Sequence, residues 1–289
     1  MTMPIQPTPP PPADISARLH DLAVVLGEPL TDSAEYTAFH ATHQGAPAVV
    51  HVLHDSPVNP VSNPHHATGL RTALRTMPVP AARLRHLEAR IAVYDPSPGT
   101  ALHSDRYPGP LPESPVLDLL EQLDKLHAWQ PAGLVHEAPT YELLSWYLDA
   151  GLLHAANASA IRSLTTPRTP LPPLQPQLGI WHPAGFTLHA DTITVTAVTG
   201  LARRLPGHDW AMLRLLWAPS NPWLIELLDR RAERDMIRGA YAVNLMLAAC
   251  HEIALHAGDR ATDRRVQRLL ADNHAMARAH LKTVYEGAW

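Results

Sequence analysis

The stretch that decides the fold is residues 179–217, GIWHPAGFTLHADTITVTAVTGLARRLPGHDWAMLRLLW. It begins with a loop containing proline and glycine, and two short segments follow, Thr-Leu-His at 187–189 and one rich in threonine, valine and isoleucine at 193–198. The tripeptide Ala190-Asp191-Thr192 between these segments predicts a β-hairpin. Apolar residues then recur at helical spacing, which predicts a helix over 209–218.

Upstream of this stretch, residues 14–95 have the pattern of a small antiparallel sheet with one helix. Segments rich in Val, Tyr, Phe and Thr predict strands at 22–26, 36–43 and 48–54, and two more strands are expected at 83–89 and 90–95. A helix is expected at 65–77, where prolines end it. A linker over 96–114 is marked by Pro96, Pro98, Pro108, Pro110 and Pro112.

The remaining residues, 115–289, are mostly helical in pattern. Residues 116–129 place leucines at helical spacing on one face. Further helices are expected at 141–156, 159–163, 209–218, 222–234, 235–257 and 260–286. A small sheet with one helix, a linker and a helical half with one hairpin together predict an α+β protein of two lobes.

Composition excludes several classes of protein. The chain has 289 residues, of which 46% are hydrophobic, and a net charge of −4, so it is expected to be globular and to bind no nucleic acid. No apolar run approaches the roughly 20 residues of a membrane span, and the single cysteine, Cys250, excludes a disulfide framework. Residues 1–13 are rich in proline, which predicts a disordered tail rather than a secretory signal, and hence a cytoplasmic protein.

Amino-acid usage also suggests the source. The chain contains 30 prolines, and lysine occurs only as Lys125 and Lys282, so arginine supplies nearly all positive charge. Such usage is typical of the codon bias of a high-GC bacterium. The same bias accounts for the 19 histidines, so they do not by themselves indicate a metal site, and no metal ligands are expected.

Four segments resemble, in order and spacing, motifs of the aminoglycoside/choline phosphotransferase branch of the protein kinase-like superfamily. Residues 123–127, LDKLH, resemble a Leu-x-x-Leu-His helix end, and residues 179–186, GIWHPAGF, resemble the catalytic loop His-Gly-Asp-Leu-His-Pro-Gly-Asn. Residues 195–200, VTAVTG, resemble the metal-binding strand Val-Thr-x-Val-Ile-Asp, and residues 207–216 resemble the helix after it. The resemblance implies a two-lobed protein kinase-like fold, with a small antiparallel-sheet N-lobe and a mostly helical C-lobe.

The resemblance also implies which positions would carry phosphoryl transfer, and this chain departs from the family at each. The lysine on the third strand corresponds to His51, and the catalytic aspartate corresponds to Ile180. The metal-binding asparagine corresponds to Phe186, if Ala184 is an inserted residue, and the metal-binding aspartate corresponds to Thr199. None of these side chains supplies the charge that phosphoryl transfer needs.

Other parts of the expected nucleotide site are also missing from the sequence. The helix at 65–77 has no acidic residue to orient a lysine, and the turn expected at 27–33 has one glycine, too few for a phosphate cradle. Pro96 and Pro98 lack the amide that would bind adenine. The resemblance therefore predicts a pseudokinase-like protein that has lost ATP-dependent phosphotransfer, with no catalytic residues, metal or cofactor.

A second alignment remains open. Residues 188–191, Leu-His-Ala-Asp, also resemble Leu-His-Gly-Asp, which would make Asp191 the catalytic base and ATP with Mg²⁺ the cofactors. The asparagine expected five residues later is Thr196, so this motif is incomplete as well. An exposed position at the tip of a hairpin is the simpler expectation for Asp191.

Three classes of function follow. The first is a non-catalytic scaffold or activator that binds a partner protein or a second copy of itself, in natural-product modification. The second is a binder of a small-molecule ligand, or an enzyme with new chemistry, in the interlobe cleft near His51, His182 and Thr199. The third is a divergent phosphotransferase acting on a small molecule or a peptide Ser/Thr. The first is the expected function.

Overall fold

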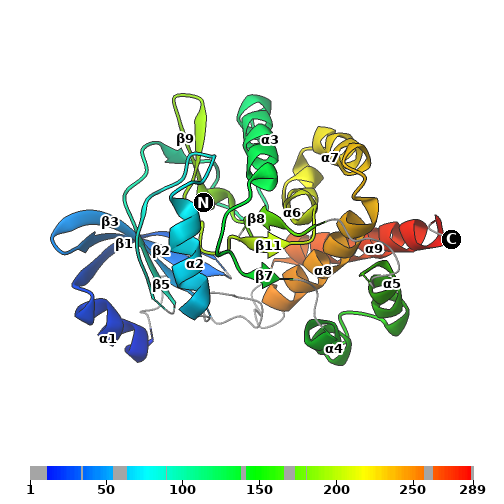
Figure 1. Cartoon of the computed structure of the whole chain (residues 1–289), viewed down its shortest axis with the longest axis horizontal. Helices are drawn as coiled ribbons and strands as arrows, with labels where there is room; N and C mark the ends of the chain where they lie inside the picture. The colour runs from blue at the N-terminus through cyan, green and yellow to red at the C-terminus, as the bar shows by residue number, and fades with distance from the viewer. Residues whose placement is uncertain are drawn as a thin grey trace.

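The computed structural model describes residues 12–33, 35–54, 64–88, 90–137, 141–165, 173–179, 181–256 and 263–287. A small N-terminal lobe built around one sheet lies beside a larger, mainly helical lobe (Figure 1). This arrangement confirms the expected α+β fold with two lobes. Residues 1–11 of the expected tail lie outside the described residues.

The N-terminal lobe contains a five-stranded antiparallel sheet in the order β1-β2-β3-β5-β4. Its strands are β1 (Val24–Asp32), β2 (Tyr36–His43), β3 (Ala46–Leu53), β4 (Leu84–Glu88) and β5 (Ile91–Tyr94). Side chains alternate between the two faces of a strand. One face, with Phe39 and Val50, packs on helix α1 (Ala13–Asp21), whereas Tyr36 and Tyr94 face the core shared with the helical lobe.

Helix α2 (Pro64–Leu74) joins the N-terminal lobe to the other lobe through a close backbone contact. Leu70 and Ala73 of α2 are buried in the shared core. A Cβ atom added to Gly69 would lie 1.7 Å from the carbonyl oxygen of Gly133. Only glycine allows α2 to lie this close to the chain of the second lobe.

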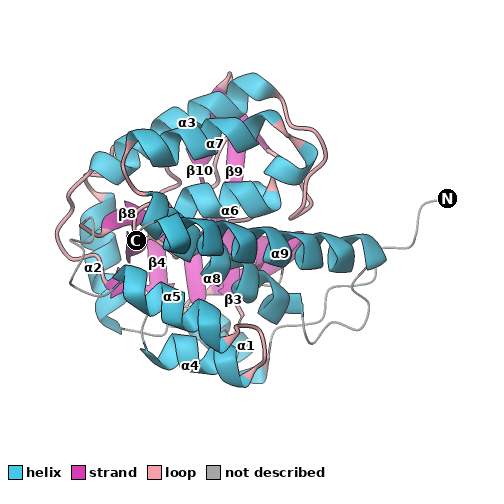
Figure 2. Ribbon diagram, turned by 90° about the vertical axis from the view of Figure 1, so that its right-hand side faces the viewer, coloured by secondary structure: helices cyan, strands magenta, loops and turns pink. Residues whose placement is uncertain are grey.

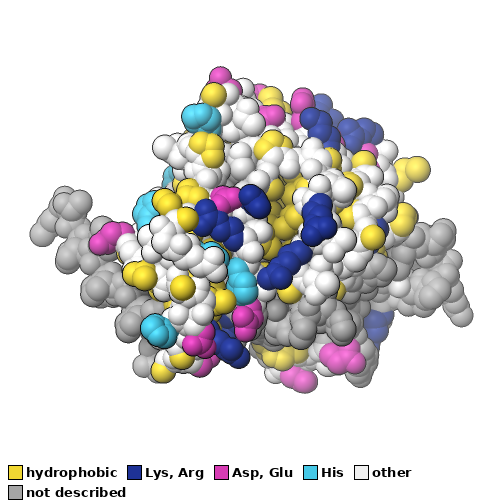
Figure 3. All heavy atoms as spheres, turned by 60° about the vertical axis from the view of Figure 1, so that its left-hand side comes forward, with side chains coloured by type: hydrophobic (Ala, Val, Ile, Leu, Met, Phe, Trp, Pro, Cys, Tyr) yellow, Lys and Arg dark blue, Asp and Glu magenta, His cyan; other side chains and the backbone are white. Residues whose placement is uncertain are grey.

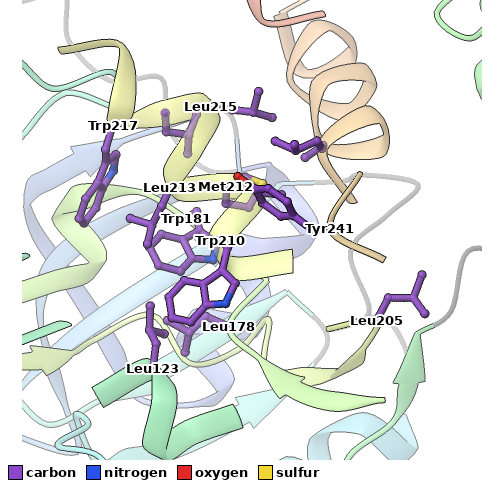
Figure 4. Packing of buried hydrophobic residues seen from close by; sticks show 14 of the residues in the cluster. Leu123, Leu178, Trp181, Leu205, Trp210, Met212, Leu213, Leu215, Trp217 and Tyr241 are labelled. Carbon is purple, nitrogen blue, oxygen red and sulfur yellow. The ribbon is translucent and has the colours of Figure 1, made fainter. Parts of the chain in front are cut away.

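The second lobe is built from seven helices of the described residues. They are α3 (Glu113–Ala128), α4 (Tyr141–Asp149), α5 (Ala155–Thr165), α6 (His208–Leu216), α7 (Trp223–Arg234), α8 (Arg238–His256) and α9 (Arg264–Gly287). Figure 2 shows α9 crossing the face of this lobe, next to α8, α6 and α5. The core centres on Trp181, Trp210 and Trp217, which are almost completely buried and lie close together (Figure 4).

Short strands position the loop between the lobes. The predicted hairpin is present as β9 (Phe186–His189) and β10 (Thr192–Val195), and β6 (Thr100–Ala101) pairs with β9. Ala190 and Asp191 form its tip with φ values of 46° and 63°, as a two-residue hairpin turn requires. A second small sheet, in the order β7-β11-β8, joins β7 (His136–Glu137), β11 (Ala202–Arg204) and β8 (Gln175–Gln177).

Several expected boundaries were wrong. Residues 27–32, expected in a turn, belong to β1, because β2 pairs with them despite irregular register at Pro29. The single helix expected at 141–156 is split into α4 and α5 near Gly151, which has a φ of 70°. The expected linker contains β6 and the first residues of α3, and α1 begins at Ala13, inside the expected tail.

The surface carries charges of both signs. On the face shown in Figure 3, Lys and Arg side chains gather near the middle, and hydrophobic side chains are scattered among charged and uncharged ones. No helix in the described part of the chain has the length and apolar character needed to cross a membrane.

Candidate functional site

The interlobe face of the N-terminal sheet carries His51, in β3. Its imidazole stacks on Tyr36, with ring centroids 4.5 Å apart and planes at 18°, and its centroid lies 4.8 Å from that of Tyr94. Only 3% of His51 is exposed, and burial lowers the pKa of its imidazole to about 3. The side chain is therefore neutral at physiological pH and brings no positive charge to the space between the lobes.

Thr199 lies shortly after β10 and is fully buried. Nε2 of His66, on α2, donates a hydrogen bond of 2.8 Å to the carbonyl oxygen of Thr199. The hydroxyl of Tyr94 also lies beside Thr199. His51 and Thr199 thus both border Tyr94, and α2 is tied to this segment by an imidazole rather than by a carboxylate.

A third position implied by the resemblance, Phe186, does not join this group. Phe186 points into the core of the helical lobe, where its ring centroid lies 5.3 Å from that of Trp181 and 5.7 Å from that of Trp217. Its side chain packs as a core residue with no polar atom to offer a ligand. Ile180 lies outside the described residues.

His182 lies in the loop before β9, and only 2% of it is exposed. Its Nδ1 accepts a hydrogen bond of 3.1 Å from the backbone amide of Ala184, and its ring meets Tyr36 edge-on at 6.3 Å. Burial and the nearby Arg106 guanidinium lower the pKa of His182 to about 3. The neutral ring therefore carries its proton on Nε2.

A buried carboxylate, Asp209 at the start of α6, holds the same loop in place. Its oxygens accept hydrogen bonds of 3.0 Å from the backbone amide of Leu178 and 2.8 Å from Nε1 of Trp181. His127, at the end of α3, lies 2.9 Å away. Burial opposes ionisation, yet the hydrogen bond from His127 and its charge keep the pKa of Asp209 below its usual value. The 123–127 and 207–216 motifs therefore meet through the His127–Asp209 hydrogen bond, which helps to hold the loop before β9 in place.

The sequence analysis missed a buried ion cluster that joins the two lobes through the linker. Arg106 donates to both oxygens of Glu252, on α8, at 2.9 and 2.6 Å, and to Glu35, in the turn between β1 and β2. The hydroxyl of Tyr107 donates a further bond of 2.9 Å to Glu252. All three charged side chains are at most 10% exposed. We call Glu35, Arg106 and Glu252 the interlobe ion cluster.

Two signals could have suggested this cluster. Glu252 interrupts the largely apolar segment of α8, where a lone carboxylate indicates a buried partner. Arg106 stands in a linker that is otherwise dominated by proline, glycine and serine. Neither signal identifies which partner each residue contacts, because the three residues lie 71 and 146 positions apart along the chain.

A cleft of about 900 Å³ opens beside the interlobe ion cluster. Arg106, Tyr107 and His182 line its inner end, and Asp32 and Ser33 of the β1–β2 turn line its N-lobe side. The side chain of Ser33 closes this turn, since it accepts a bond of 3.1 Å from the amide of Tyr36. Asp191 lies elsewhere, exposed at the tip of the β9–β10 hairpin.

Comparison with known proteins identifies the fold. A choline/ethanolamine kinase family protein from Mesorhizobium loti has a TM-score of 0.62 and 17% identity, covering 94% of this chain and 99% of that chain. The gentamicin complex of APH(2'')-IIa has a TM-score of 0.57 and 11% identity, covering 95% of this chain and 97% of that chain. Aminoglycoside phosphotransferase APH(4)-Ia with ADP and hygromycin B has a TM-score of 0.52 and 13% identity, covering 94% of this chain and 97% of that chain. The chain has the protein kinase-like fold of these phosphotransferases. No family model and no curated protein matches its sequence.

At the described positions where the resemblance implies nucleotide or metal ligands, His51, Phe186 and Thr199 supply neither a cation nor a carboxylate. The stack of Tyr36, His51 and Tyr94 occupies the interlobe face of the sheet, and it is uncharged. At the β1–β2 turn the charged side chain is the carboxylate of Glu35, which is paired with Arg106. In the part of the chain that the structure describes, no group of three or more His, Cys, Asp or Glu side chains could hold a metal ion.

We expect the buried imidazole of His51 to make stability depend on pH. Its pKa is about 3 in the folded state and about 6.5 in the unfolded chain. The unfolded state therefore binds the extra proton between these values, and stability falls as pH drops below about 6.5, by up to about 1.4 kcal/mol per pH unit. His51→Phe keeps an aromatic ring between the tyrosines and should make this dependence less steep in urea denaturation from neutral to acidic pH, while His182 and His208, whose pKa values are also lowered to about 3, keep contributing to it.

The matched control for this experiment is His40→Phe, on the exposed part of β2. It should leave the dependence of unfolding free energy on pH as in the parent protein. An unchanged pH dependence in His51→Phe would contradict the burial of a neutral imidazole at this position.

Proposed function

We propose that this protein is a non-catalytic member of the kinase-like fold that binds a partner protein, as a scaffold or activator. The observation that carries the proposal is the neutral His51 ring, which lies between Tyr36 and Tyr94. The family resemblance places a phosphate-binding lysine at this position. We further propose natural-product modification in a high-GC bacterium as its setting.

The charges around the loop before β9 support the proposed loss of phosphoryl transfer. The transition state spreads negative charge over the phosphoryl oxygens and needs cations around it. Two buried cations lie near the loop before β9: Arg106 is held by two carboxylates, and Arg204 donates to the backbone carbonyls of Gln177 and Gly200. The cluster as a whole has one more negative than positive charge, so it offers no net attraction to a triphosphate.

A second candidate, a small-molecule binder, is favoured by the cleft of about 900 Å³. Its size is within the range of ligand pockets, and it combines apolar and polar lining. The relatives named above include complexes with gentamicin and hygromycin B. Such aminoglycosides carry several ammonium groups, whereas the cleft is lined by three arginines and three aspartates, so its charge does not favour a ligand of either sign.

A thermal-shift experiment tests the proposal against an active phosphotransferase. ATP, ADP and GTP, each with and without Mg²⁺ or Mn²⁺, should leave the melting temperature unchanged, because the site lacks the groups that hold a magnesium nucleotide. A ligand present at 100 times its Kd stabilises a protein by about 2.7 kcal/mol, which is a readily measured shift. A metal-dependent increase with any nucleotide would contradict the proposal.

A further inference from the structure

The N-terminal end of α9 carries three unpaired arginines. Arg264, Arg265 and Arg268 are exposed in its first two turns. None of their guanidinium groups forms an ion pair with any residue in the described ranges. Positive charge is unfavourable at a helix N-terminus, where the free backbone amides attract anions instead. Asp263, which accepts a hydrogen bond from the amide of Arg265, offsets part of this positive charge, and a further acidic group would stabilise the rest.

Two adjoining hollows lie along this end of α9. The first is the interlobe cleft of about 900 Å³, and the second has about 470 Å³. Tyr107, Arg265 and Leu269 line both, so the two hollows share a wall. Apolar side chains such as Val266 and Leu216 contribute to their lining. We call these hollows together the α9 groove.

The acidic side chains around the α9 groove offset only part of the charge of its arginines. Those that line it are Asp32, Asp105, Asp263 and Asp272. Asp32 accepts a hydrogen bond of 2.7 Å from the hydroxyl of Thr37, and Asp263 accepts one of 3.1 Å from the backbone amide of Arg265. Neither bond involves a guanidinium group, and the second hollow is lined by Arg264, Arg265 and Arg268 against Asp272 alone, so its lining stays net positive.

We propose that the α9 groove binds an acidic peptide segment of a partner protein, an inference that rests on the proposed partner-binding function. Carboxylates of the peptide would bind the guanidinium groups of Arg264, Arg265 and Arg268, with the paired geometry that arginine favours. Apolar side chains of the peptide would lie over the half-buried Leu269. The helix rises about 12 Å from Arg264 to Asp272, which matches about four residues of extended peptide.

Fluorescence anisotropy with two labelled probes tests this inference. The acidic probe is Asp-Leu-Glu-Leu-Asp, and the basic probe is Lys-Leu-Arg-Leu-Lys. We expect the acidic probe alone to bind, more weakly as salt increases. The double variant Arg265→Glu/Arg268→Glu should weaken its binding at least about tenfold. Leu269→Ser should also weaken binding, because it removes apolar contact while keeping every charge.

The matched control is Arg278→Glu/Lys282→Glu, which makes the same charge change at exposed positions further along α9. It should leave binding of the acidic probe nearly unchanged. Melting curves of all variants check that folding is preserved, as the exposed positions of the arginines predict. Equal binding of the two probes, or an equal loss in the control, would overturn the inference.

Inorganic tripolyphosphate as a competitor separates a peptide site from a general anion site. If it displaces the acidic probe and Leu269→Ser has no effect, the groove binds polyanions and the peptide assignment is wrong. Phosphotransfer is measured separately, on the same preparation. Turnover of ATP together with probe binding would overturn the proposed non-catalytic function but not the peptide site in the α9 groove. Absence of both turnover and probe binding would overturn the peptide site alone.

Discussion

The protein is expected to transfer the γ-phosphate of ATP at least a hundredfold more slowly than kinases, which turn over at roughly 1–100 s⁻¹. The loss of one electrostatic group commonly costs about 10²–10³ in rate. His51 offers a neutral ring in place of a lysine, and Thr199 and Phe186 offer no carboxylate or amide. These losses need not multiply, because the groups act as a unit, but one alone is sufficient for the expected result.

An assay with labelled ATP and broad substrate pools, including peptides and aminoglycosides, measures this rate. Asp191→Asn is the informative variant, since Asp191 is the base in the other alignment. It should leave the background unchanged, as its side chain is exposed at the hairpin tip. Turnover that disappears in Asp191→Asn would refute the non-catalytic proposal and make Asp191 the catalytic base.

Arg106→Met is expected to lower the free energy of unfolding by about 3–5 kcal/mol, because it leaves the buried carboxylates of Glu35 and Glu252 without a cation. These carboxylates belong to different lobes, and Arg106 contacts both. Arg106 also helps to hold the pKa of Glu252 below its usual value, against the opposing effect of burial. Urea denaturation followed by tryptophan fluorescence measures the change.

Arg85→Met is the matched control, because it removes an arginine that pairs with Asp95 in a more exposed position. Exposed pairs contribute at most about 1 kcal/mol. The triple variant Glu35→Gln/Arg106→Met/Glu252→Gln should recover most of the lost stability, since it removes all three charges together. Equal costs for Arg106→Met and Arg85→Met would show that the interlobe ion cluster is not a buried charge network.

Local patterns predicted the elements whose stability depends on neighbours in the chain. The β9–β10 hairpin follows from two short β-branched segments around Ala190 and Asp191, and its turn needs only local backbone conformation. The helices of the second lobe follow from apolar spacing. β1 could not be predicted over residues 27–32, because Gly27 and Pro29 disfavour a strand locally and its pairing with β2 overrides them.

The sequence was enough to place His51 on the third strand and Thr199 after the hairpin, since both positions follow from the order of elements. Only the tertiary structure shows that His51 is neutral, because its pKa depends on burial between Tyr36 and Tyr94 from other strands. The pairing of Arg106 with Glu35 and Glu252 was equally beyond prediction. Periodicity reports the conformation of neighbouring residues, whereas the partners of a buried charge are chosen by folding, which brings distant segments together and removes water from between them.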